Sequence, residues 1–157
     1  MSDEVESTCV VPYIVSGTCA VDDRGVLVAV ECDELPFAPA RVFTVIPQSA
    51  GTVRGSHAHA RCSQVLFCVQ GQVTVSVRGD WGEAQHSLKP NGEGLVVPPL
   101  TWSSQTYPLQ ASCLLVFSSH HYDADDYITD EDTLAALRSV AEPQRHMASS
   151  ARPSAPR

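Results

Sequence analysis

Two histidines separated by one residue, His57 and His59, are the strongest chemical feature of the sequence. Side chains two positions apart on an extended segment point to the same face, so the two imidazoles are expected to project together. Gln64 follows and would add a third polar group. Such a set predicts a metal site or a site for acid–base catalysis, because histidine gains and loses a proton near neutral pH. The alternative, that both rings only satisfy hydrogen bonds inside a barrel, is disfavoured by Arg54 and Gly55 beside them.

The spacing around the pair resembles the first motif of the cupin superfamily, Gly-x5-His-x-His-x4-Glu/Gln-x6-Gly. All of its positions are present, as Gly51, His57, His59, Gln64 and Gly71. The second motif is half present, with Gly92 and Pro98 in place but Leu100 and Ser103 replacing its glycine and its histidine. Metal-binding cupins use both histidines, a carboxylate and that last histidine. Two imidazoles with a neutral amide and a hydroxyl are a weak ligand set. We therefore expect no metal and no other cofactor.

The segments that must position this pair read as short strands, rich in β-branched residues and bounded by turn residues. They are residues 10–15, 26–32, 40–46, 65–69, 73–77, 86–89, 95–97 and 113–117. Residues 73–77 alternate valine with threonine or serine, which predicts one buried and one wet face. Strands without intervening helices exclude an α/β architecture. The fold class expected is all-β, a cupin jelly-roll barrel (a double-stranded β-helix) with one C-terminal helix.

That helix is predicted after Thr129, which offers a hydroxyl cap, because Leu134, Leu137 and Val140 recur at helical spacing. Pro143 is expected to end it. Residues 1–142 are therefore interpreted as a single cupin domain. Residues 143–157 lack apolar periodicity and are interpreted as a disordered tail.

Composition narrows the class of partner. The chain has 157 residues, 43% of them hydrophobic and 18% charged, and a formal net charge of −8. This balance disfavours a nucleic-acid binder, which needs clustered lysine and arginine. It does not exclude a phosphorylated small ligand held by a few arginines. The polar, acidic start and the absence of a long apolar run predict no secretory signal and no membrane span, hence a cytoplasmic protein.

Six cysteines show no CxxC spacing: Cys9, Cys19, Cys32, Cys62, Cys68 and Cys113. Most lie within apolar runs, so we expect buried free thiols. Cys62 is the one nearest the histidine pair, but nothing in the sequence around it would favour its thiolate as a nucleophile.

A longer series of motifs runs through residues 20–130. It comprises Asp23-Arg24-Gly25-x-Leu27, Leu35-Pro36-Phe37, Arg41-Val42, Arg54-Gly55-x-His57-Ala58-His59, Val97-Pro98-Pro99-x-x-Trp102 and Tyr122-Asp123-x-Asp125-Asp126-Tyr127-Ile128. This series resembles the nucleotide-sugar 3,4-ketoisomerases, small metal-independent cupins that act on dTDP-4-keto-6-deoxyglucose.

The resemblance implies an isomerase that moves the keto group from C4 to C3 through an enediol. It implies His59, with His57 beside it, as the proton carrier. Arg41 and Arg54 would bind the diphosphate of a dTDP-linked substrate, since guanidinium suits bidentate phosphate contacts, or would hold the pocket in shape. Trp102 or Phe43 would lie against the base or sugar, although plain core packing of Trp102 is the alternative. The resemblance also implies a homodimer whose subunits exchange an N-terminal strand.

The sequence departs from the family where tyrosines usually follow the Arg-Val pair, one of which is counted as catalytic. Phe43 and Thr44 stand there. Phenylalanine has no exchangeable proton, and threonine is a far weaker acid than a phenol. Three readings therefore stay open. The first is an active ketoisomerase in which Thr44, Ser103 or a water fills the gap, with Gln64 also in the pocket. The second is a relative recruited to another metal-free proton shift or cyclisation. The third is a non-catalytic cupin that binds a nucleotide sugar or a partner protein.

Overall fold

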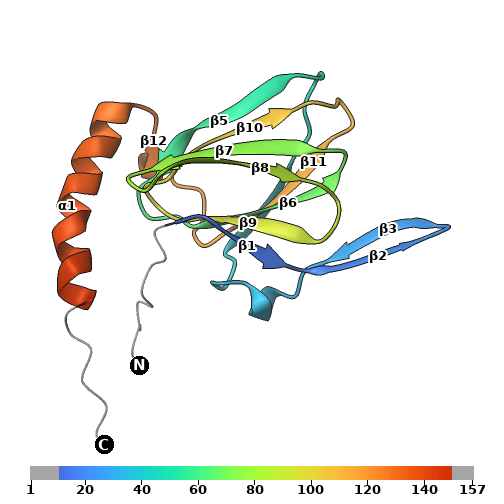
Figure 1. Cartoon of the computed structure of the whole chain (residues 1–157), viewed down its shortest axis with the longest axis horizontal. Helices are drawn as coiled ribbons and strands as arrows, with labels where there is room; N and C mark the ends of the chain where they lie inside the picture. The colour runs from blue at the N-terminus through green and yellow to red at the C-terminus, as the bar shows by residue number, and fades with distance from the viewer. Residues whose placement is uncertain (1–10, 150–157) are drawn as a thin grey trace, which may run out of the picture.

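A computed structural model describes residues 11–149, and strands dominate it (Figure 1). Two five-stranded antiparallel sheets form the body of the molecule. The first has the order β1-β9-β6-β11-β4, with bounds Tyr13–Ser16, Glu93–Val97, Gln64–Gln70, Cys113–Ser118 and Arg41–Val45. The second has the order β12-β5-β10-β7-β8, with bounds Tyr127–Ile128, Thr52–His59, Trp102–Tyr107, Val73–Gly79 and Gly82–Leu88. The predicted all-β cupin fold is confirmed.

The main core lies between the two sheets and explains why these segments are strands. On β7, Val73, Val75 and Val77 are at most 2% exposed, whereas the residues between them are only partly buried. They pack against side chains from the other sheet, including Leu66 and Leu114. Because side chains alternate along a strand, this pattern fixes which residues face the interior.

The outer face of the first sheet carries a second apolar cluster. Val65, Phe67, Val96 and Phe117 are buried there and are covered by partly buried residues that include Leu35 and Phe37. The segment between β3 and β4, which contains the short 3₁₀ helix η1 (Cys32–Glu34), thus closes this face.

A hairpin made of β2 (Thr18–Asp22) and β3 (Gly25–Ala29) projects away from the barrel (Figure 1). Every residue of β2 is exposed, and Val21 is 73% and Leu27 58% exposed. A two-stranded hairpin is marginally stable in water without a packing partner. The exposed apolar side chains of this hairpin would be stabilised by packing against another surface.

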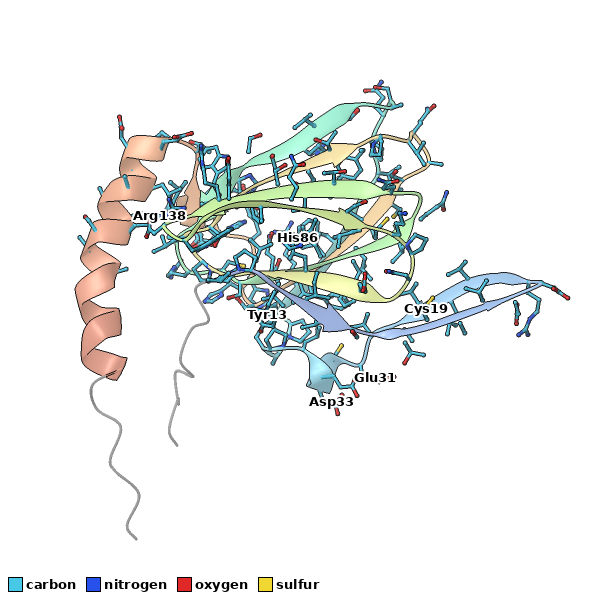
Figure 2. The ribbon with its side chains drawn as sticks, in the orientation of Figure 1. Tyr13, Cys19, Glu31, Asp33, His86 and Arg138 are labelled. Atoms are coloured by element: carbon cyan, nitrogen blue, oxygen red, sulfur yellow. The ribbon has the colours of Figure 1, made fainter. Side chains whose placement is uncertain are left out.

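The C-terminal helix α1 (Glu131–Ser149) lies on the opposite side of the barrel from the hairpin (Figure 1). Leu134 is buried against Ala58 and Ile128. The Arg138 guanidinium donates hydrogen bonds to the carbonyl oxygens of Leu100 and Arg78, and Figure 2 shows this side chain between helix and barrel.

The expectation that Pro143 ends the helix is wrong, because α1 continues to Ser149. A proline removes one helical N–H, but residues 141, 142, 144 and 145 (Ala, Glu, Gln and Arg) are good helix formers. Residues 150–157, the rest of the predicted tail, lie outside the described residues.

Four strands were not among those predicted: β2, β5, β10 and the two-residue β12. Serine, threonine, glutamine and glycine fill much of β5 and β10, so the sequence of these two strands carries little strand signal. The expectation of buried thiols is also wrong in part. Cys62 and Cys68 are buried, but Cys19 on the hairpin (Figure 2) and Cys32 in η1 are exposed, because these segments lie outside the barrel. Cys9 lies outside the described residues.

Candidate active site

A cavity of about 500 Å³ opens into the barrel interior. The residues that line it come mostly from β4, β5, β6, β10 and β11 of the two sheets and from β12. They are Arg41, Phe43, Thr44, Val45, Ile46, Arg54, Gly55, His57, Gln64, Leu66, Gln105, Leu114, Val116 and Tyr127. A volume of this size suits a small organic ligand, and the wall combines polar groups with apolar side chains.

The histidine pair reaches this cavity through an irregularity in β5. Gly55 and Ser56 both have positive φ, 79° and 61°, and the register against β10 shifts between Ser103 and Ser104. Beyond this bulge, Ala58 packs outward under α1, so His57 and His59 point inward. Their ring centroids are 5.0 Å apart at an interplanar angle of 84°.

His59 is paired with a carboxylate from a distant part of the chain. Its Nδ1 lies 3.0 Å from Oδ2 of Asp126, and the two side chains are 11% and 5% exposed. Asp126 ends the short helix η2 (Ala124–Asp126), and its carboxylate also accepts hydrogen bonds from the backbone N–H groups of Arg61 and Cys62. The buried acid is thus fully satisfied, and its remaining bond orients His59.

These contacts determine which nitrogen of His59 is basic. Burial alone would raise the pKa of Asp126, but the hydrogen bonds from the Arg61 backbone and from His59 outweigh it and lower that pKa. An ionised carboxylate only accepts, so Nδ1 of His59 carries the hydrogen and donates it. Nε2 then holds the lone pair, and the Gln64 amide lies 3.3 Å from it. His57 and Gln64 line the cavity whereas His59 does not, so Nε2 lies beside the cavity lining, in contact with the Gln64 amide.

Both histidines are held neutral at neutral pH. Burial lowers the pKa of His57 below 6.5, partly opposed by a backbone hydrogen bond at Gly55. Burial also lowers the pKa of His59, and the charges of His57 and Arg41 add to that effect, while Asp126 opposes it. A neutral imidazole is the form that accepts a proton, so either ring can serve as a base.

Arg41 lies on the cavity wall between two aromatic rings. Its guanidinium carbon is 4.6 Å from the Phe43 ring centroid and 5.3 Å from that of Tyr122. Stacking of this kind holds a guanidinium in place while leaving its N–H groups free to bind an anion. Arg54 lies on the same cavity but on the other sheet. Two cationic groups therefore face one cavity.

Three predicted site residues lie elsewhere than expected. Trp102 is on the outer face of β10, beside Arg78, and packs near Ala58 and Leu134, because strand alternation turns Ser103 inward instead. We correct the prediction that Trp102 contacts substrate in the barrel. Ser103 is buried, and its hydroxyl accepts from the Gln105 amide at 3.2 Å rather than lining the cavity. Thr44 borders the cavity but lies on the exposed face of β4.

Three residues of the site were not predicted from the sequence: Asp126, Tyr127 and Gln105. Tyr127 lies against both histidines, with its ring centroid 4.8 Å from His57 and 4.5 Å from His59. Gln105 packs directly on Gly55. The first two belong to the Tyr122–Ile128 motif, but 67 residues separate Asp126 from His59, so no local spacing could pair them.

One group of potential metal ligands exists among the described residues. The ligand atoms of His59, Cys62 and Asp126 lie within 4.8 Å of one another. These are donor types that zinc accepts, but two of the three already hydrogen-bond to each other. The absence of a metal cofactor stays a prediction.

The two-sheet barrel and its inward-facing histidine pair define a cupin-type protein. Residues 13–139 match the family described as FdtA, WxcM-like, C-terminal, and the chain belongs to this family. A TDP-4-oxo-6-deoxy-α-D-glucose-3,4-oxoisomerase from Aneurinibacillus thermoaerophilus is 32% identical over 114 residues, which are 71% of this chain and 81% of that relative.

Solved structures agree with this assignment. The 3,4-ketoisomerase QdtA from Thermoanaerobacterium thermosaccharolyticum, in complex with TDP, matches with a TM-score of 0.75 and 27% identity, over 82% of this chain and 96% of that one. The TDP-quinovose 3,4-ketoisomerase WlaRB from Campylobacter jejuni matches with a TM-score of 0.71 and 29% identity, over 81% and 97%. Within residues 11–149, α1 is too polar to cross a membrane, and no other helix is long enough.

Proposed function

We propose that this protein is a metal-independent sugar isomerase that moves the keto group of dTDP-4-keto-6-deoxyglucose from C4 to C3. The observation that carries the proposal is the Asp126–His59 pair, which lies directly beside the cavity-lining residues His57 and Gln64. Its relatives support the substrate, because the oxoisomerase from Aneurinibacillus thermoaerophilus is named for the TDP-linked 4-oxo sugar. QdtA also binds TDP-4-keto-6-deoxyglucose in a solved complex of one of its variants.

In the proposed reaction, Nε2 of His59 takes the proton from C3 and an enediol forms. The ketone at C4 makes this proton acidic, so the protein needs to supply only a base, placement and support for the developing charge on oxygen. His59 then returns the proton to C4, and C3 becomes the ketone. Asp126 supports this role, because a carboxylate at Nδ1 fixes the tautomer and stabilises the imidazolium that forms.

We propose that the other cavity residues bind and orient the substrate. Arg41 and Arg54 would bind the diphosphate, since both are cationic and line the cavity. His57 and Gln64 would contact the sugar beside His59, and Phe43 would pack against an apolar face of it. Thr44 lies on the exposed face of its strand, so we propose only that it lies at the entrance of the cavity. Ser103 would position the cavity-lining Gln105, because its hydroxyl accepts a hydrogen bond from the Gln105 amide.

We further propose that the chain is a homodimer in which the β2–β3 hairpin packs on the neighbouring subunit. The exposed Val21 and Leu27 support this, because burial against a neighbouring subunit would stabilise apolar side chains that are exposed among the described residues. The cytoplasmic location stays a prediction.

The test is to incubate the purified chain with dTDP-4-keto-6-deoxyglucose, after removal of metals with a chelator, and follow the carbonyl carbon by NMR. We expect the C4 carbonyl signal to be replaced by one at C3. Tight binding of TDP without any such conversion would favour a recruited or non-catalytic cupin and reject the isomerase.

A further inference from the structure

The keto shift requires more than the carbon-bound proton that His59 moves. As C3 loses its proton, the oxygen at C4 becomes a hydroxyl. As C4 gains a proton, the hydroxyl at C3 must lose its own. One group that can both give and take a proton on oxygen is therefore required, and this requirement rests on the proposed function.

Few cavity residues are suited to exchange such a proton. Among the described residues that line the cavity, the guanidinium and amide groups do not release protons at neutral pH, and most of the others are apolar. Phe43 stands where the family usually has a phenol, and the Thr44 hydroxyl lies on the exposed face of β4. His57 and Tyr127 are left. A phenol starts protonated, so it can give a proton first and take one back.

Tyr127 is held where such a group is needed. It is paired across β12 and β5 with His59, next in sequence to Asp126, so the strand ladder fixes it relative to the base. Its ring centroid lies 4.5 Å from that of His59 and 4.8 Å from that of His57. The ring therefore contacts both imidazoles at the cavity wall.

The hydroxyl of Tyr127 is available for substrate. It makes no hydrogen bond with any residue that the structure describes, and the side chain is only partly buried. A partnered phenol would have to break a protein hydrogen bond before it served the sugar. Here a ligand oxygen in the cavity would be its first partner.

We propose that the Tyr127 hydroxyl carries the oxygen-bound proton of the isomerisation and so supplies the phenol that Phe43 lacks. In the first step the C3–H bond breaks and its proton goes to Nε2 of His59. Its electron pair forms the C3–C4 double bond, and the C4 oxygen takes the Tyr127 proton. In the second step the Tyr127 phenolate takes the proton from the C3 hydroxyl, C3 becomes the ketone, and His59 returns its proton to C4. Both residues end as they began.

The test compares Tyr127→Phe with Tyr107→Phe. The first variant keeps the ring against the histidines and removes only the hydroxyl. The second is a matched control, because Tyr107 is fully buried, its hydroxyl has no hydrogen-bond partner among the described residues, and it does not line the cavity. Turnover of dTDP-4-keto-6-deoxyglucose, TDP binding and thermal unfolding are measured for each.

We expect Tyr127→Phe to lower kcat by about 10²- to 10³-fold, the usual effect of losing one proton donor or oxyanion donor. KM and TDP affinity should change by less than about threefold. Tyr107→Phe should stay within about twofold of the wild type. A Tyr127→Phe enzyme with near-wild-type kcat would overturn the proposal, as would an equal loss in Tyr107→Phe, which would show that the loss does not depend on a hydroxyl in the cavity. A wild-type chain that binds TDP but turns over no substrate would refute the proposed function, and this inference with it.

Discussion

The Asp126 carboxylate is the residue that makes His59 different from His57. Both rings lose basicity through burial, but only His59 has an acid that opposes this loss. The bond at Nδ1 leaves Nε2 as the site that takes up a proton. The basicity and the tautomer of His59 therefore depend on Asp126, which does not line the cavity.

Replacing Asp126→Asn tests this dependence. An amide can present either its oxygen or its NH₂ group to Nδ1, so the tautomer is no longer fixed and the imidazolium loses its counter-charge. We expect kcat to fall by about 10²- to 10⁴-fold with little change in KM, measured by steady-state turnover. Asp125→Asn is the matched control, because Asp125 is exposed and should have no effect. Equal losses in both variants would contradict the assignment.

The pH dependence of the wild type belongs to the same prediction. The base must be neutral, and burial lowers the pKa of His59 below its ordinary value of 6.5. The acidic limb of kcat/KM, measured in the free enzyme, should therefore be centred below pH 6.5, with full activity retained above it. An acidic limb centred above 6.5 would mean that the base is a different group or is far more exposed.

At the scale of the element, the bulge in β5 decides which way the histidines point. Gly55 has φ +79°, and a Cβ built on it would lie 2.6 Å from Oε1 of Gln105. An alanine there would suffer both backbone strain and a clash with a cavity-lining side chain. Gly51 begins the same motif with φ +82°, yet has nothing within 4 Å of such a Cβ.

The two glycines therefore form a matched pair. Gly51→Ala should cost about 1–2 kcal/mol of unfolding free energy, from the left-handed backbone alone. Gly55→Ala should cost more and should also lower kcat, because Gln105 and the turn into His57 must move. Urea unfolding and turnover measure the two effects. Full activity in Gly55→Ala would show that the bulge does not position the site.

The elements also show what the sequence could and could not predict. The valine alternation of β7 and the His-x-His spacing are local patterns, so the barrel and the shared direction of His57 and His59 followed from them. The Asp126–His59 pair depends on bringing β12 beside β5, which is a property of the whole fold. Trp102 was misplaced for the same reason, because the polar sequence of β10 did not reveal which of its faces points inward.

At the scale of the whole molecule, the hairpin and α1 project from opposite sides of one barrel (Figure 1). The hairpin exposes Val21, Val26 and Leu27, whereas α1 exposes Leu137 and Val140. The proposed dimer would bury the first set. Its formation would then contribute to the stability of each subunit, since most of the hairpin is exposed among the described residues.

Light scattering after size-exclusion chromatography tests this part of the account. We expect the wild type to elute as a dimer and the double variant Val21→Asp/Leu27→Asp to dissociate, because two charges would be placed in an apolar interface. Val140→Asp on α1 is the control, since Val140 is 66% exposed at the other side of the barrel, and it should stay dimeric. A monomeric wild type would refute the dimer.

The central claim, that His59 moves the proton between C3 and C4, is tested most directly in heavy water. The wild type should convert dTDP-4-keto-6-deoxyglucose into the 3-keto sugar with deuterium at C4, detected by NMR, because the proton on Nε2 exchanges with solvent before it is returned. His59→Asn should bind TDP normally and form no product, with no deuterium entering C3 of the recovered substrate. Wild-type chain that leaves C3 and C4 free of deuterium and forms no product, or a His59→Asn variant as active as the wild type, would contradict the account.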